Sequence, residues 1–127
     1  MSLLAQMERA TSHILLQGMA DLLDGIQLLL ANTPEDHFLL SCRSRGLRAL
    51  RGYAKSFPIG LPRYHHFLGL SELRRNQLRR AGRTFQHGLR IAVELGLPED
   101  GSLLRADLEH LRRAMDGDRD ALSRAIR

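Results

Sequence analysis

The sequence is short of cysteine, tryptophan and lysine, and each shortage excludes a class of protein or site. Cys42 is the single cysteine among the 127 residues, which excludes an internal disulfide framework and favours a reducing, cytoplasmic compartment. Tryptophan is absent and aromatic residues make up 5%, which leaves few rings to stack on nucleic-acid bases. Lys55 is the only lysine, and no glycine-rich loop ends in Gly-Lys-Ser/Thr, which excludes a nucleotide-hydrolysing core of that kind.

A long apolar run that is free of charge is also missing. The most apolar stretch, residues 14–31, contains Asp21 and Asp24, and carboxylates near the centre of a bilayer are costly. The N-terminus lacks a basic region followed by an apolar core and a small-residue cleavage site. We therefore expect no membrane partner, and a buried or amphipathic helix over these residues.

Strand signals are missing as well, so the expected fold is all-α. Valine, isoleucine and threonine are sparse, apolar residues do not alternate with polar ones, and no hairpin dipeptide separates two apolar runs. With 43% hydrophobic and 26% charged residues, the chain has the composition of a folded protein. We expect a single domain over residues 1–127 that is a piece of a longer protein. It should hold about six helices in antiparallel pairs, near residues 4–31, 35–57, 63–76, 78–96, 99–115 and 118–126.

Proline, glycine and capping residues mark the expected breaks between these helices. Thr33 is expected to cap the second helix, with Pro34 at its first helical position. The segment 57–62 holds two of the four prolines and is the clearest boundary in the chain. Gly96 should stop the fourth helix, since a proline follows two residues later. Asp118 should cap the last helix after a turn that starts two residues earlier.

The first helix carries a wide apolar face. Apolar residues recur along it at steps of three and four, and others widen the face, so we expect the helix to be well buried. It is also apolar enough to mediate a homodimer, which the sequence leaves open. The face consists of Leu15, Met19, Leu22, Ile26 and Leu29, widened by Leu16, Leu23 and Leu30.

Helices 63–76 and 78–96 match part of the tetratricopeptide pattern. In that pattern the first helix carries a Leu-Gly pair, and the second carries an alanine with a phenylalanine four residues later. His65 and Glu72 replace the two aromatic residues of the pattern, so the match is partial and a generic helical bundle is the alternative. Small residues would let the two helices approach closely, with a phenylalanine in the groove between them. The residues that carry the match are Leu68, Gly69, Ala81 and Phe85.

Three further runs carry a resemblance to a family. They are residues 48–63, residues 82–83 followed by 92–100, and residues 103–108. Together these runs resemble the C-terminal tetratricopeptide-like region of large bacterial signalling proteins, which carry an adenylate/guanylate cyclase or protein kinase domain and a predicted ATPase module. The resemblance covers residues 45–112. It implies a non-catalytic protein-interaction or regulatory domain, to which no catalytic motif can be carried over.

Charge is distributed unevenly along the chain. Residues 37–93 hold twelve basic residues and one acidic residue, whereas residues 1–36 hold one basic and five acidic residues. Clustered arginines can bind carboxylate or phosphate groups through paired hydrogen bonds, so a protein or peptide with acidic groups, including another domain of the parent chain, is the expected partner. A solvated face is the alternative, and nucleic acid is not expected for want of exposed aromatics. The residues expected to bind the partner are Arg75, Arg79, Arg83, Tyr64 and His65. A stand-alone bundle that binds an anion such as nucleic acid through these arginines is the second functional hypothesis.

The sequence offers no constellation for catalysis or metal binding. His65 and His66 are adjacent and point about 100° apart on a helix, and no histidine has another at the three- or four-residue step of a metal pair. Cys42 follows apolar residues and is expected to pack. We therefore predict no catalytic residue, no metal site, no cofactor and no enzymatic activity for this chain alone.

Overall fold

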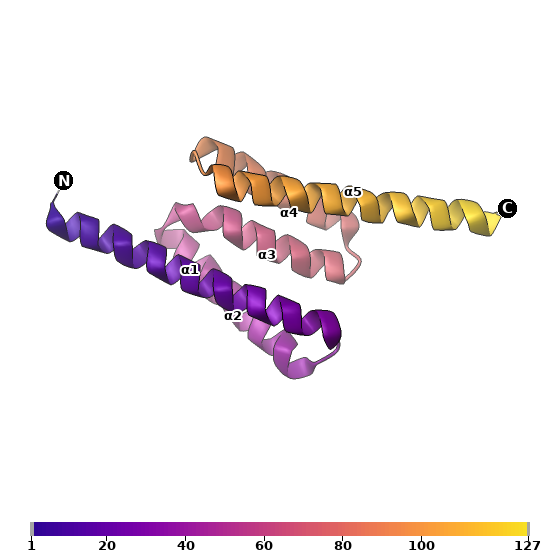
Figure 1. Ribbon diagram of the computed structural model, residues 1–127, viewed down its shortest axis with the longest axis horizontal. Coiled ribbons are helices and arrows are strands. Elements are labelled where there is room, and N and C mark those ends of the chain that lie inside the picture. Colours follow the sequence, from indigo (N-terminus) through magenta and orange to yellow (C-terminus); the bar gives the residue numbers. More distant parts are fainter. Residues whose placement is uncertain (1, 127) are drawn as a thin grey trace. The chain divides into compact units, whose positions relative to one another are not determined.

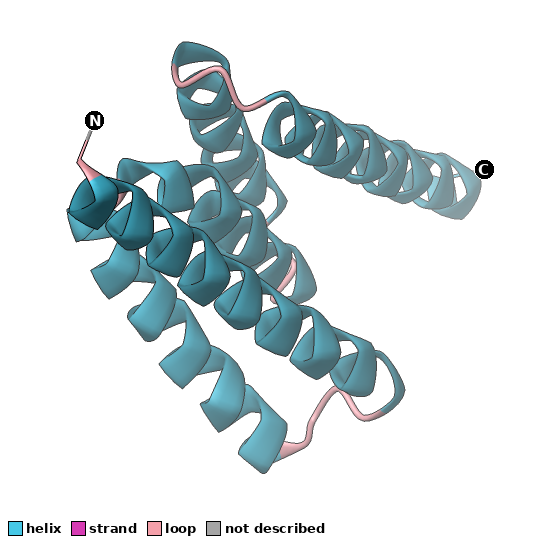
Figure 2. Ribbon diagram, turned by 60° about the vertical axis from the view of Figure 1, so that its left-hand side comes forward, coloured by secondary structure: helices cyan, strands magenta, loops and turns pink. Residues whose placement is uncertain are grey.

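The computed structural model describes residues 2–126, with the side chains at 8–11, 120–122 and 126 left out. The all-α prediction is confirmed: about 90% of the protein is helical, and residues 2–126 contain no strand (Figure 2). Within residues 2–126 the structure has five α-helices and one 3₁₀ turn, one helix fewer than predicted, and they follow each other in the order seen in Figure 1. They are α1 (Leu3–Asn32), α2 (His37–Ser56), η1 (Pro58–Gly60), α3 (Leu61–Arg74), α4 (Leu78–Glu94) and α5 (Pro98–Ile126).

The helices form two compact units. The first unit is Met1–Gly60, with α1, α2 and η1, and the second is Leu61–Arg127, with α3, α4 and α5. The division falls inside the segment 57–62 that the two prolines marked as a boundary. The single domain that the chain length suggested stays a prediction.

In the first unit, α1 packs along α2 as a helical hairpin. Leu23 and Leu30 of α1 and Leu50 of α2 are almost fully buried. A Cβ atom added to Gly46 would lie 2.7 Å from the Leu23 side chain, so this glycine lets the two helices approach closely. The Tyr53 hydroxyl donates a hydrogen bond of 2.7 Å to the carbonyl oxygen of residue 12 and so ties the two helices at their other end.

The prediction that the first helix is well buried is wrong. Leu15, Leu22 and Leu29 are 53%, 60% and 58% exposed. The apolar face of α1 is wider than one neighbouring helix can cover, and α2 covers only the side that holds Leu23 and Leu30. By length and composition alone α1 could cross a membrane, a test that core helices and signal sequences also pass. The absence of a membrane partner therefore stays a prediction.

In the second unit, α4 packs between α3 and α5. Phe85 of α4 is fully buried, and a Cβ atom added to Gly69 of α3 would lie 2.3 Å from its ring. A Cβ atom on Gly88 would lie 2.6 Å from that of His65. Glycines therefore set the close approach of α3 and α4, and Phe85 fills the space at Gly69. The core of the unit consists of Ala81, Phe85, Ala92, Leu104 and Leu111.

Helices α3 and α4 end in the same way. Asn76 and Gly96 both have positive φ angles, of 60° and 67°. The next residue after each donates a backbone hydrogen bond back to the helix, Gln77 to Glu72 and Leu97 to Ala92. Both ends are therefore Schellman motifs. Gly96 stops α4 as predicted, and at the end of α3 the left-handed position is occupied by Asn76.

The predicted cap of the second helix is wrong. The Asp36 side chain accepts a hydrogen bond of 3.1 Å from the Leu39 amide and caps α2. The Thr33 hydroxyl instead donates to the Leu29 carbonyl and closes α1. Aspartate is a better N-cap than threonine, and Asp36 lies directly before the first residue of α2, His37.

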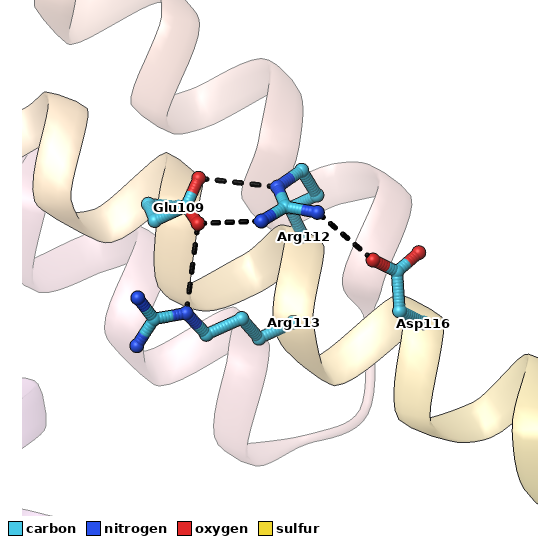
Figure 3. Close-up of polar contacts among 4 residues, drawn as sticks. All are labelled: Glu109, Arg112, Arg113 and Asp116. Carbon is cyan, nitrogen blue, oxygen red and sulfur yellow. Dashed lines mark hydrogen bonds and ion pairs between the residues drawn. The ribbon is translucent and has the colours of Figure 1, made fainter.

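The predicted turn at residues 116–118 is also absent, because α5 runs without a break through Asp118. Gly117 lies inside this helix, where a glycine costs only about 1 kcal/mol relative to alanine. Arg112 bridges Glu109 and Asp116 across adjacent turns (Figure 3). Its hydrogen bonds hold the pKa of the Glu109 carboxyl below its usual range. The second half of α5 extends past the α3–α4 hairpin (Figure 1).

Candidate anion-binding groove

An open groove of about 430 Å³ lies between α3 and α4 in the second unit. Residues of α4 at steps of three and four line one side of it, and α3 supplies the other side. The lining is mostly basic and polar. It consists of His65, Leu68, Arg80, Arg83, Thr84 and His87.

Glu72 is a buried acid next to this lining. Its residue is only 6% exposed, and its carboxylate accepts hydrogen bonds from Arg80 and from Thr84. The Arg80 Nε atom lies 2.9 Å from one carboxylate oxygen. A buried carboxylate needs such partners, because an unpaired one is costly. Glu72 therefore fixes Arg80 and Thr84 in place and neutralises the charge of Arg80.

Arg83 is the second arginine of the groove, beside Arg80. It is exposed on α4, and none of the acidic side chains that the structure describes forms an ion pair with it. A guanidinium in this state can form two parallel hydrogen bonds to a carboxylate or a phosphate. The groove therefore presents a donor pair that none of the described acidic side chains satisfies.

His65 and His87 form the histidine pair of the groove. Their ring centroids are 4.8 Å apart and the rings meet edge to face. Burial lowers the pKa of His65 and the His87 charge adds to this, while the Leu61 carbonyl and the Glu72 carboxylate oppose it. The Nδ1 atom of His65 lies 2.8 Å from the Leu61 carbonyl oxygen, which can only accept. The neutral ring therefore carries its proton on Nδ1 and leaves Nε2 as an acceptor.

The structure brings together only part of the predicted binding set. Arg83 and His65 line the groove, and Tyr64 is half-buried with its ring edge-on to His65 at 5.5 Å. Arg75 and Arg79 are exposed but do not line the groove, because Arg75 follows the end of α3 and Arg79 lies in the first turn of α4.

Among the predicted packing residues, Leu68 lines the groove, while Gly69, Ala81 and Phe85 are buried beneath it. The sequence reasoning missed the other side of the site. Arg80, Thr84 and His87 follow one another at steps of four and three, which places them on one face of α4 with Arg83 at its edge. That spacing was the signal available in the sequence.

Two other polar contacts, at buried or partly buried side chains, hold the second unit together and do not belong to the groove. His66 donates a hydrogen bond of 2.5 Å to Asp107, and Arg63 donates one of 2.7 Å to Asp100. Both contacts join α3 to α5. In the first unit, Arg43, one of the twelve basic residues of 37–93, is only 6% exposed, so it is not part of a solvated surface.

The described side chains offer no metal site, since nowhere among them do three histidine, cysteine, aspartate or glutamate residues come together. Cys42 is half-buried on α2.

Comparisons of the chain with protein-family models, curated proteins and solved structures find no match. The chemistry of the groove is therefore the basis on which a function can be assigned.

Proposed function

We propose that this chain is a non-catalytic helical interaction domain that binds an acidic segment of a partner protein in the α3–α4 groove. The observation that carries the proposal is Arg83, an exposed guanidinium at the edge of a groove whose other arginine is already paired with Glu72. None of the acidic side chains that the structure describes pairs with Arg83. A partner carboxylate would complete the hydrogen bonds that the protein leaves open at Arg83.

The histidine pair supports an acidic partner. An incoming carboxylate would raise the pKa of His65 by stabilising its charged form. His65 would then take up a proton when the carboxylate binds, and its charged ring would be a second cation beside Arg83. The groove therefore favours carboxylates more strongly as the pH falls toward the ordinary histidine pKa of 6.5.

The arrangement of the second unit supports a repeat-like architecture for this domain. α5 packs against both α4 and α3, as the first helix of a following tetratricopeptide-like repeat would. We propose such a repeat, with a generic helical bundle as the alternative. The further proposal that the chain is a regulatory region of a bacterial signalling protein with a cyclase, kinase or ATPase domain rests on the sequence resemblance over residues 45–112 alone.

Binding of a fluorescein-labelled hexaglutamate peptide, followed by anisotropy, tests the proposal. The wild-type chain should bind, and Arg83→Gln should weaken binding by about tenfold or more, since a charge-assisted hydrogen bond is lost. Arg51→Gln removes the same charge from an exposed position on α2 and should change binding little.

Equal weakening by the two substitutions would mean unspecific charge attraction and would contradict the proposal. A single-stranded oligodeoxynucleotide of similar charge serves as the competitor. If it binds more tightly than the peptide, with a steep dependence on salt, the partner is a nucleic acid and the second functional hypothesis replaces the first.

A further inference from the structure

The first unit carries a large apolar surface that its own core does not use. Eight large apolar side chains of α1 are more than half exposed. Each leaves roughly 100 Å² of apolar surface in solvent, so together they expose on the order of 800 Å². Monomeric proteins rarely expose apolar patches of more than a few hundred Å². The side chains are Leu3, Leu4, Met7, Ile14, Leu15, Leu22, Leu28 and Leu29.

Within this surface three leucines form a straight ridge. Leu15, Leu22 and Leu29 are spaced by seven residues, which returns each to nearly the same side of an α-helix. We call these three residues the leucine ridge. Gly18 and Gly25 lie between them, and a Cβ atom added to either glycine would meet nothing within 4 Å. The ridge therefore alternates large side chains with open notches along one exposed face.

We propose that the leucine ridge is the interface of a homodimer, in which α1 of one chain packs against α1 of a second copy. Two-fold symmetry presents the same patch on both chains. The second copy therefore supplies an apolar surface of equal length, with notches that can receive the leucines. The ridge supplies about 300 Å² of this surface, so an interface of standard size, in which each partner buries roughly 800 Å², would also take in the other exposed apolar side chains of α1.

The charges of α1 favour a second copy over a lipid surface. Asp21 and Asp24 lie off the ridge, about 100° and 160° around the helix from Leu22, so the three leucines form an uncharged stripe and the only charged residues within 10–32 are acidic. An interfacial membrane helix instead carries Lys and Arg beside its apolar face, to meet anionic headgroups. The other side of α1 is occupied by α2, and the hydrogen bond from Tyr53 fastens the two helices. This inference rests on α1 and is independent of the proposed groove function.

Sedimentation equilibrium of the full chain over a range of concentrations tests the proposal. The wild-type chain should be a dimer at micromolar concentrations, and raising the salt should not dissociate it because the ridge is apolar. The double variant Leu15→Glu/Leu22→Glu should weaken dimerisation at least 100-fold and sediment as a monomer. Val93→Glu, at an equally exposed apolar residue of α4, should remain a dimer. Far-ultraviolet circular dichroism verifies that each variant is folded.

A second measurement keeps the test decisive if the double variant does not fold. A chain with Cys42→Ser and Leu22→Cys carries its only thiol on the ridge, and oxidation should link most of it into disulfide dimers. The matching chain with Cys42→Ser and Val93→Cys should stay unlinked. A monomeric wild-type chain at about 100 µM, or equal linking at the two positions, would overturn the proposal. Co-sedimentation of the wild-type chain with phosphatidylcholine vesicles, with loss of the dimer, would assign the ridge to a membrane instead.

Discussion

Phe85 is the side chain on which the packing of the second unit depends most. It is fully buried, and the ring lies against the backbone of Gly69. Phe85→Ala should lower the free energy of unfolding by about 3–5 kcal/mol, because it removes a large buried side chain and leaves a cavity. Urea unfolding measures this. Val93→Ala, at a residue that is 61% exposed, should change stability by less than about 0.5 kcal/mol, and a similar effect of the two would contradict the buried position of Phe85.

Substitution of Gly69 and of Gly52 by alanine should change the stability of the protein in opposite directions. Gly69→Ala places a methyl group 2.3 Å from the Phe85 ring and should destabilise the protein by about 1–3 kcal/mol through overpacking. Gly52 lies inside α2 with open space around it, so Gly52→Ala should stabilise by up to about 1 kcal/mol through helix propensity. Thermal unfolding tests this, since the melting temperature should fall for Gly69→Ala and rise for Gly52→Ala. A stable Gly69→Ala protein would mean that α3 and α4 do not approach as closely as described.

His65 should make the protein more sensitive to acid. Burial lowers its pKa below the ordinary value of 6.5, so the unfolded chain binds a proton at this residue more readily than the folded chain. The stability that a neutral His65 contributes is present above pH 6.5 and is lost as the pH falls below it. Urea unfolding measures the free energy of unfolding at pH 7.5 and at pH 5.5. Between these two values the free energy of unfolding should fall less for His65→Gln than for the wild type. His13→Gln, at an exposed position, should lose as much as the wild type, and an equal loss in all three would contradict the prediction.

The binding residues show how far single side chains can be assigned from sequence. Arg83 was predicted as one of the clustered arginines and His65 as a residue near them, and both line the groove. Arg75 and Arg79 belong to the same cluster in sequence but lie outside the groove. Sequence reasoning also missed that Glu72 neutralises Arg80, since this pairing depends on how the turn between the two helices folds back.

At the scale of elements, helix positions were predictable and their ends were not. The periodicity of apolar residues located α1 to α4 and the first half of α5. The turn after α1 was misplaced because Thr33 and Asp36 are both competent caps, and only the hydrogen bonds distinguish them. The break in α5 was wrong because a single glycine is a weak helix breaker when ion pairs bridge the adjacent turns. The exposure of α1 depends on how many helices cover it, and the spacing of apolar residues along the sequence does not reveal that number.

Asp36, which caps α2, and Asp118, which was predicted to cap a helix, should respond differently to substitution by alanine. Asp36→Ala removes the side chain that accepts the Leu39 amide, and should destabilise the protein by about 1 kcal/mol. Asp118→Ala, inside the continuous α5, should change stability by less than about 0.5 kcal/mol. Chemical denaturation of both variants provides the comparison. A larger effect at Asp118 would mean that a helix begins there and that α5 is broken.

At the scale of the whole molecule, the two units carry surfaces of different chemistry. The first unit exposes an apolar ridge on α1, and the second unit exposes a basic groove between α3 and α4. Salt should weaken peptide binding in the groove and leave the association through α1 intact, since screening acts on charges and not on apolar contacts. Two separable surfaces are what an interaction domain that assembles and also binds a ligand requires.

The central claim is that the α3–α4 groove binds an acidic segment, and nuclear magnetic resonance tests it most directly. Titration of the ¹⁵N-labelled chain with the hexaglutamate peptide should shift the amide signals of the groove residues first, with those of Arg83, Thr84 and His87 moving most. Arg83→Gln should abolish these shifts at the same peptide concentration. Shifts confined to α2, or spread evenly over all exposed arginines, would contradict the claim and leave the basic residues as a solvated surface.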